Sequence, residues 1–189
     1  MKLKNFYSAL LSATLLSSSI SSSFACTVLA IKDANGNVYQ GRTNEFAGQQ
    51  PDSLTYWPSG TKMESITPDG KQGKSFSTKY GILAVTLIKL VPAAKQDSIH
   101  EGVNDQGMTI TTNAMINDIQ LPAPGAPDKT LAATDFGVWA LGNFQNVAQV
   151  KKAIENKEVE IWLPTIPSMA NFKAPLHFAL YDKVGGNIV

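Results

Sequence analysis

The first 25 residues of the chain decide which part of it is left to fold. A short basic start precedes an apolar run from about Phe6 to Leu16, and a serine-rich segment follows. This order is typical of a secretory signal peptide, because the apolar run is shorter than the ~20 residues that a membrane-spanning helix needs. Ser23 and Ala25 fit the small-x-small pattern of a cleavage site. We therefore predict that residues 1–25 are a signal peptide and that the protein is exported, periplasmic or secreted.

Cleavage after Ala25 leaves residues 26–189, which is 164 of the 189 residues and enough for one domain. A single cysteine in an exported chain cannot form an internal disulfide, so an ordinary hydrophobic core must stabilise this domain. The domain has no second run of ~18 apolar residues, so we expect no membrane association once the signal peptide is removed.

Charge and metal-binding residue types exclude two further classes of partner. Removing Lys2 and Lys4 from the 16 basic residues leaves 14, against 15 acidic residues. This near-neutral balance gives no reason to expect a nucleic acid partner. Two histidines and one cysteine are too few for an ordinary zinc site, and we expect no cofactor.

Cys26 is the residue around which the functional hypotheses are built. After cleavage it would carry a thiol and a free α-amino group, and an amine with a pKa of ~8 can take the thiol's proton. Such a residue supplies nucleophile and base together. Two other interpretations remain open, a lipid-attachment cysteine and an idle buried thiol. Lipoproteins usually have an aliphatic residue three positions before the cysteine, where this chain has Ser23.

The next segment predicts a β-hairpin that returns to the N-terminus. Strands are expected at 27–31 and 38–42, joined by an Asn35-Gly36 turn. With a two-residue turn, Cys26 faces Glu45 and Arg42 lies on the opposite face of the hairpin. A register change of one residue, or a bulge, would bring Arg42 to the Cys26 face. With either register the turn brings Arg42 and Glu45 back beside the N-terminus, where they would tune the pKa of the thiol and hold a polar substrate group, or merely form a surface ion pair.

The rest of the chain alternates strand and helix signals in an α+β pattern with antiparallel hairpins. Asn113 lies near the end of a predicted strand, where it would donate its side-chain N–H to an oxyanion or serve as a turn asparagine. His177 lies inside another predicted strand and is interpreted as a core histidine. The predicted elements are strands at 54–57, 80–90, 108–115, 159–163 and 176–182, a loop or hairpin tip at 65–75, a turn at 101–107, a buried helix at 130–144 and a second helix capped by Asn146.

Six short motifs, in order, resemble those of the choloylglycine hydrolase family, which contains bile salt hydrolases and penicillin V acylases. They extend across nearly all of the chain after residue 25. They are 25–27 (ACT), 41–45 (GRTNE), 54–60 (LTYWPSG), 101–108 (EGVNDQGM), 141–144 (LGNF) with the following helix, and 175–178 (PLHF) with Asp182. The export signal makes the chain more similar to the penicillin V acylases of Gram-negative bacteria.

The resemblance implies a four-layer αββα N-terminal-nucleophile hydrolase fold, with two antiparallel sheets between helix layers. It also implies hydrolysis of a non-peptide amide bond, with Cys26 as nucleophile and Arg42 beside it. Glu45 stands where the family usually has aspartate, and the family's oxyanion residue falls near Asn113 or Ala114. Penicillin V, conjugated bile salts and acyl-homoserine lactones are the implied substrates, and relatives of this kind commonly form homotetramers.

Family members continue well beyond residue 189, so we expect this fold to be incomplete at its C-terminus. The resemblance does not settle whether this chain is active by itself. The alternatives to a hydrolase are a catalytically inactive exported binding protein of the same fold and a lipoprotein anchored through Cys26.

Overall fold

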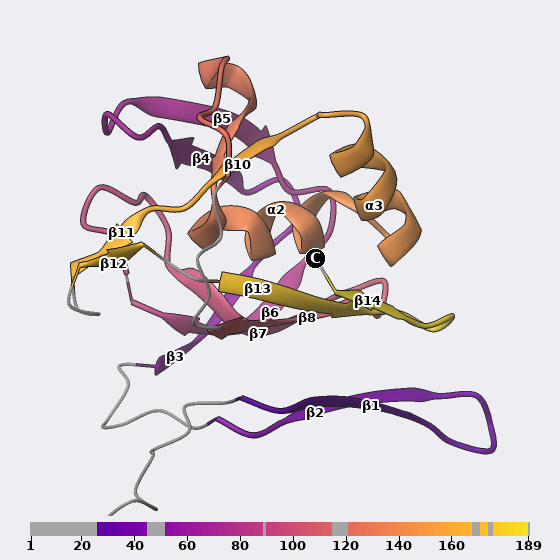
Figure 1. Ribbon diagram of the computed structural model, residues 1–189. Coiled ribbons are helices and arrows are strands. Elements are labelled where there is room, and N and C mark those ends of the chain that lie inside the picture. The colour runs from indigo at the N-terminus through magenta and orange to yellow at the C-terminus, as the bar shows by residue number, and fades with distance from the viewer. Residues whose placement is uncertain are drawn as a thin grey trace, which may run out of the picture.

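The computed structural model describes residues 26–44, 52–88, 90–114, 121–167, 171–173 and 176–188. Within these ranges the chain forms two antiparallel layers of strands and a helical layer (Figure 1). The strands are β1 Val28–Lys32, β2 Val38–Arg42, β3 Asp52–Trp57, β4 Lys62–Ile66, β5 Gln72–Ser77, β6 Ile82–Leu87, β7 Ser98–Asn104, β8 Thr109–Ala114, β9 Thr130–Ala132, β10 Glu160–Trp162, β11 Thr165–Ile166, β12 Phe172–Lys173, β13 Leu176–Tyr181 and β14 Gly186–Ile188. The helices are the 3-10 turns η1 Pro127–Lys129 and η2 Ala133–Asp135 and the α-helices α2 Phe136–Asn143 and α3 Val147–Glu155.

A six-stranded sheet organises the molecule. Its strand order is β14-β13-β8-β7-β6-β3, and all of its neighbouring strands pair antiparallel. The predicted strand at 80–90 is confirmed as β6, which lies between β7 and the edge strand β3. The prediction that residues 101–107 form one turn is wrong, because residues 101–104 belong to β7. Gly102 allows this strand to pass close to α2, since a Cβ there would lie 2.9 Å from a methyl carbon of Leu141.

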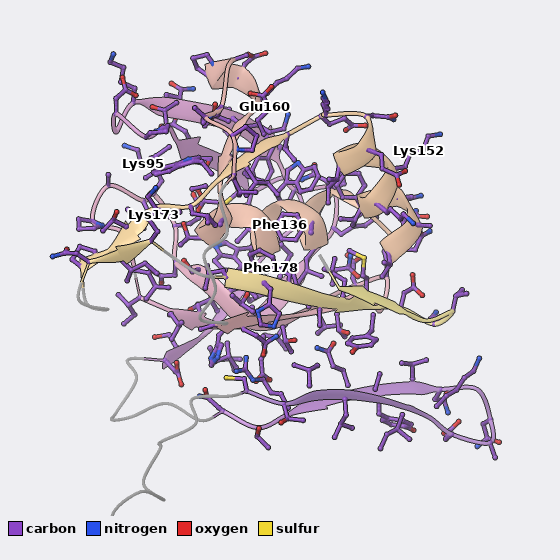
Figure 2. All side chains as sticks on the ribbon, in the orientation of Figure 1. Lys95, Phe136, Lys152, Glu160, Lys173 and Phe178 are labelled. Atoms are coloured by element: carbon purple, nitrogen blue, oxygen red, sulfur yellow. The ribbon has the colours of Figure 1, made fainter. Side chains whose placement is uncertain are left out.

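The hydrophobic core lies between this sheet and α2. Every second residue of the strands faces the helix, as the two-residue period of a strand requires. Phe136 of α2 and Phe178 of β13 point toward one another, with ring centroids 4.5 Å apart (Figure 2). Fully buried members of the core include Ile82, Met108, Ile110, Leu131, Phe136, Val138, Ala140, Leu141, Val150 and Leu180.

The two helices differ in how they are covered. In α2, every residue from Phe136 to Gly142 is buried. The β4–β5 hairpin and the β9–β10 pair lie on the side of α2 that faces away from the sheet (Figure 1). The more exposed α3 is amphipathic, and the Asn146 side chain caps it by accepting a hydrogen bond of 3.0 Å from Gln149 N–H, as predicted.

The predicted buried helix begins later than expected. It was predicted from residue 130, but Thr130–Ala132 forms strand β9, and α2 begins at Phe136. The reason is a long-range pairing, because β9 runs parallel to β10 with Leu131 opposite Ile161. The predicted helix end near Asn143 is confirmed.

The β1–β2 hairpin lies on the other side of the six-stranded sheet from α2 (Figure 1). It forms a second layer of strands stacked on that sheet. Its outward face carries Leu29, Ile31 and Tyr39, which are about half exposed. The functional candidates lie between these two layers.

Candidate functional site between the two sheets

The turn between β1 and β2 differs from the predicted two-residue turn. A type I′ turn needs a positive φ at both central residues. Gly36 has a φ of 86°, but Asn35 is not among the described residues with a positive φ. Instead, the Asp33 carboxylate accepts hydrogen bonds from the backbone N–H groups of Asn35 (2.9 Å) and Asn37 (2.8 Å). These bonds stabilise a longer loop, 33–37, and move the strand register by one residue.

This register places Arg42 on the same face of the hairpin as Cys26. Arg42 is directly opposite Val28, and the ladder continues with the Thr43 N–H donating to the Thr27 carbonyl at 2.9 Å. Directly opposed residues share a face, and so do residues two apart along a strand. The expectation from a two-residue turn is therefore wrong, and the alternative of a one-residue change of register is confirmed.

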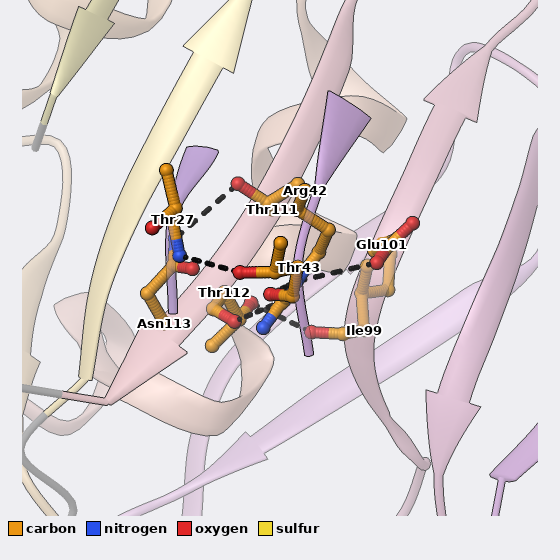
Figure 3. A network of polar contacts seen from close by, with 8 residues as sticks. All are labelled: Thr27, Arg42, Thr43, Ile99, Glu101, Thr111, Thr112 and Asn113. Atoms are coloured by element: carbon orange, nitrogen blue, oxygen red, sulfur yellow. Dashed lines mark hydrogen bonds and ion pairs between the residues drawn. The ribbon is translucent and has the colours of Figure 1, made fainter. Parts of the chain in front are cut away.

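The Arg42 guanidinium joins the hairpin to the central sheet. Its side chain is only 3% exposed, and its Nε lies 3.3 Å from Oε1 of Glu101. Nη1 donates to the carbonyl of Thr112 at 2.8 Å, and Nε also donates to the carbonyl of Thr43 at 3.2 Å (Figure 3). Arg42 is therefore not part of a surface ion pair. It is a buried cation whose described counter-ion, Glu101, comes from β7.

A second polar contact joins the hairpin to β8. Thr109 donates its hydroxyl hydrogen to Oε1 of Gln40, which lies on the same face of β2 as Arg42. The Nε2 atom of Gln40 is buried and has no hydrogen-bond partner among the described residues. The space between the two layers is thus lined by polar groups as well as by apolar ones.

Asn113 lies on the face of β8 that looks toward the hairpin. Thr111 is directly opposite Glu101, the partner of Arg42, so Thr111 and Asn113 share the hairpin side of the sheet. Ala114 lies on the opposite face. Asn113 is 2% exposed, and its Nδ2 donates to the Thr111 hydroxyl at 3.3 Å. The position of Asn113 is therefore that of a buried strand residue and not of a turn asparagine.

His177 is directly opposite Asn113, on β13. Its side chain is half-buried, and its Nδ1 atom is buried without a partner among the described residues. Burial, and then the positive charge of Arg42, lower the pKa of His177 below its ordinary value. Both causes favour the neutral form of the imidazole. His100, which precedes Glu101, is also buried, and the same two causes lower its pKa.

The structure thus brings together Cys26, Arg42 and Asn113 on facing surfaces of the two layers. Cys26 is half-buried. Glu45 lies outside the described residues. Glu101 and His177 are the residues that sequence analysis missed as members of the site. Residues two apart along a strand share a face, so Glu101 shares one with Val103, and His177 shares one with Ala179. This period could have placed Glu101 and His177 on the hairpin side of the sheet if the strand bounds had been known.

No group of three or more potential metal ligands occurs in the described ranges. Within those same ranges, no helix is long and apolar enough to cross a membrane.

Comparison with known proteins assigns the family. A family model described as linear amide C-N hydrolases, choloylglycine hydrolase family, matches residues 26–189. The chain belongs to this family. A bile salt hydrolase/transferase of Clostridium perfringens (strain 13 / Type A) is 25% identical over 166 residues, which are 87% of this chain and 47% of that protein.

Solved structures confirm the predicted fold class. An arginine-to-leucine variant of the conjugated bile acid hydrolase from Clostridium perfringens superposes with a TM-score of 0.68 at 20% identity, covering 87% of this chain and 47% of that one. Penicillin V acylase from Agrobacterium tumefaciens gives a TM-score of 0.66 at 18% identity, with 87% and 46% covered. This member of the choloylglycine hydrolase family therefore has the N-terminal-nucleophile hydrolase fold of these proteins, and the chain spans about half of their length.

Proposed function

We propose that the full-length protein hydrolyses a non-peptide amide bond through Cys26. The observation that carries this proposal is the buried Arg42, which the hairpin register places on the Cys26 face and which docks onto Glu101 and Thr112. Burying a guanidinium is costly unless it is paired. Membership of a linear amide hydrolase family, with a match that begins at Cys26, supports the assignment.

The proposed reaction has two half-reactions. The free α-amine of Cys26 takes the thiol proton, and the sulfur attacks the amide carbonyl carbon, whose oxygen becomes an oxyanion. The carbonyl re-forms as the carbon–nitrogen bond breaks, and the α-ammonium gives its proton to the leaving amine. Water then attacks the thioester carbon while the α-amine takes one of its protons. The carbon–sulfur bond breaks, the carboxylic acid leaves, and the α-ammonium returns its proton to the sulfur to restore the free thiol and amine. No cofactor takes part.

The other site residues have supporting roles in this proposal. Asn113 donates Nδ2–H to the oxyanion, a kind of contact whose loss costs ~10²–10³ in rate. Arg42 lies beside the nucleophile and holds a polar group of the substrate. Glu45, for which the family usually has aspartate, contacts the α-amine.

The substrate we propose is an acyl amide with a polar head group. The names of the relatives with solved structures give penicillin V and conjugated bile acids as their substrates. Acyl-homoserine lactones have the same kind of amide beside a polar head group. The proposal includes removal of residues 1–25 and export to the periplasm or the medium. Assembly into a homotetramer is also proposed, and light scattering of the purified protein tests it.

The direct test is Cys26→Ser in the full-length protein, assayed with penicillin V and a conjugated bile salt. We expect loss of most turnover with unchanged folding, and undiminished hydrolysis would overturn the proposal. Lys32→Gln, at the exposed far end of β1, is the matched control and should keep full activity. Substrate binding without any turnover by the parent protein would instead indicate an inactive binding protein. A diacylglyceryl adduct on Cys26 would indicate a lipoprotein.

A further inference from the structure

Two buried polar atoms without partners belong to directly opposed residues of the β8–β13 ladder. They are Oδ1 of Asn113 and Nδ1 of His177, and neither has a hydrogen-bond partner among the described residues. An unpaired buried polar atom is uncommon in a folded protein and costs about 1–3 kcal/mol. Because the two atoms belong to directly opposed residues, a hydrogen bond between them would satisfy both.

The geometry of the ladder allows this contact. Asn113 and His177 are Cα partners in the antiparallel register, and the Cβ atoms of such partners lie about 4.5–5.5 Å apart. Oδ1 and Nδ1 are each two bonds beyond Cβ, so rotation of the two side chains brings them within hydrogen-bond distance. A neutral imidazole carries one N–H, on either Nδ1 or Nε2, and its surroundings select which one.

We propose that His177 is a positioning residue for Asn113, donating Nδ1–H to Oδ1 and so fixing the orientation of the carboxamide. This inference rests on the proposed function, because it concerns the donor that Asn113 offers to the oxyanion.

The contact decides which end of Asn113 faces the substrate. With Oδ1 bound to His177, Nδ2 is the only end left to point elsewhere. One of its two hydrogens bonds the Thr111 hydroxyl, as observed at 3.3 Å. The second hydrogen is free for the oxyanion. Without His177 the carboxamide can rotate by half a turn and present an acceptor, which would repel the oxyanion.

The first test does not depend on activity. The printed chain has two histidines, His100 and His177, so ¹⁵N NMR of imidazole-labelled full-length protein can assign the tautomer, with His177→Asn identifying the signal. We expect the Nδ1–H tautomer for His177. Asn113→Leu, which has a similar shape and no oxygen, should shift that signal. An Nε2–H tautomer in the parent protein, or no response to Asn113→Leu, would overturn the inference.

The second test compares three substitutions of His177 in the hydrolysis assay. Asparagine places its amide nitrogen near the Nδ1 position, glutamine places it one carbon farther out, and leucine has no donor. We expect His177→Asn to retain most of kcat. His177→Gln and His177→Leu should each lower kcat about tenfold with little change in KM, the size expected for loss of one hydrogen bond that acts in the transition state. A residue that only fills space would instead be replaced better by glutamine, so that ranking would refute the inference.

The two proposals can fail separately. If the full-length parent protein shows no hydrolysis, the proposed function fails and the NMR experiment still decides the contact. If hydrolysis is present and the tautomer is Nε2–H, only the His177 inference fails. A Leu substitution of His177 that does not fold leaves the asparagine–glutamine comparison and the NMR result to decide.

Discussion

Replacing Glu101 should destabilise the protein as much as replacing Arg42, although Glu101 is far more exposed. The side chain of Glu101 is 43% exposed, whereas that of Arg42 is 3% exposed. Glu101→Gln therefore leaves a buried cation without the counter-ion that β7 supplies. Arg42→Met removes the buried charge itself and leaves a carboxylate that water can reach.

The expected magnitudes follow from these exposures. Removing one partner of a fully buried ion pair costs ~3–5 kcal/mol, and partial hydration of Glu101 reduces this to ~2 kcal/mol for Glu101→Gln. Arg42→Met leaves the Thr112 carbonyl without its guanidinium donor, at a cost of ~1–2 kcal/mol. The double variant lacks both charges of this pair, so it should be no less stable than Arg42→Met alone.

The assay is a double-mutant cycle on the free energy of unfolding, measured by urea denaturation at constant salt. We expect the two substitutions to be non-additive by ~2 kcal/mol. Additive effects, or a cost of Glu101→Gln below ~0.5 kcal/mol, would show that Glu101 does not compensate the charge of Arg42.

Three further predictions concern the stability of the fold. Burial raises the pKa of Asp135 from 3.8 to about 6, although the side chains of Ser65 and Gln96 donate hydrogen bonds to its carboxylate. The protonated carboxyl therefore adds about 3 kcal/mol to the free energy of unfolding, and this contribution is fully present below pH 3.8 and is lost as pH rises through about 6. Asp135→Asn should flatten the dependence of the unfolding free energy on pH. Asn104→Leu should cost ~3 kcal/mol or more in urea denaturation. This buried side chain donates to the carbonyl of Leu141 in α2 and to that of Phe144 just after it, and it accepts from two N–H groups of the β7–β8 turn. Asn146→Ala should lower the thermal midpoint by removing a helix cap worth ~1 kcal/mol, whereas Lys151→Ala on the exposed side of α3 should leave it unchanged.

Local patterns predicted the elements whose signals are local. The apolar run around β6, the cap at Asn146 and the stop after Asn143 depend on neighbouring residues, and all three were found from the sequence. The start of α2 was misplaced because Thr130–Ala132 pairs with a strand about 30 residues away. No local propensity signals such a pairing.

The geometry of the candidate site could be predicted only in part. Spacing brought Cys26 and Arg42 to the same end of one hairpin. The face on which Arg42 lies depended on the turn, where the Asp33 carboxylate competes with the Asn35-Gly36 turn signal. Glu101 was missed because the glycine beside it suggested a turn, whereas that glycine lets β7 approach Leu141.

Intact mass spectrometry of the purified full-length protein, quenched during turnover of penicillin V, tests directly whether Cys26 is the nucleophile. We expect a parent species that begins at an unmodified Cys26. We also expect a transient second species, heavier by the acyl group, with the added mass on that cysteine. Hydrolysis by a protein that keeps residues before Cys26, or hydrolysis without any acyl adduct on Cys26, would show that Cys26 is not an N-terminal nucleophile.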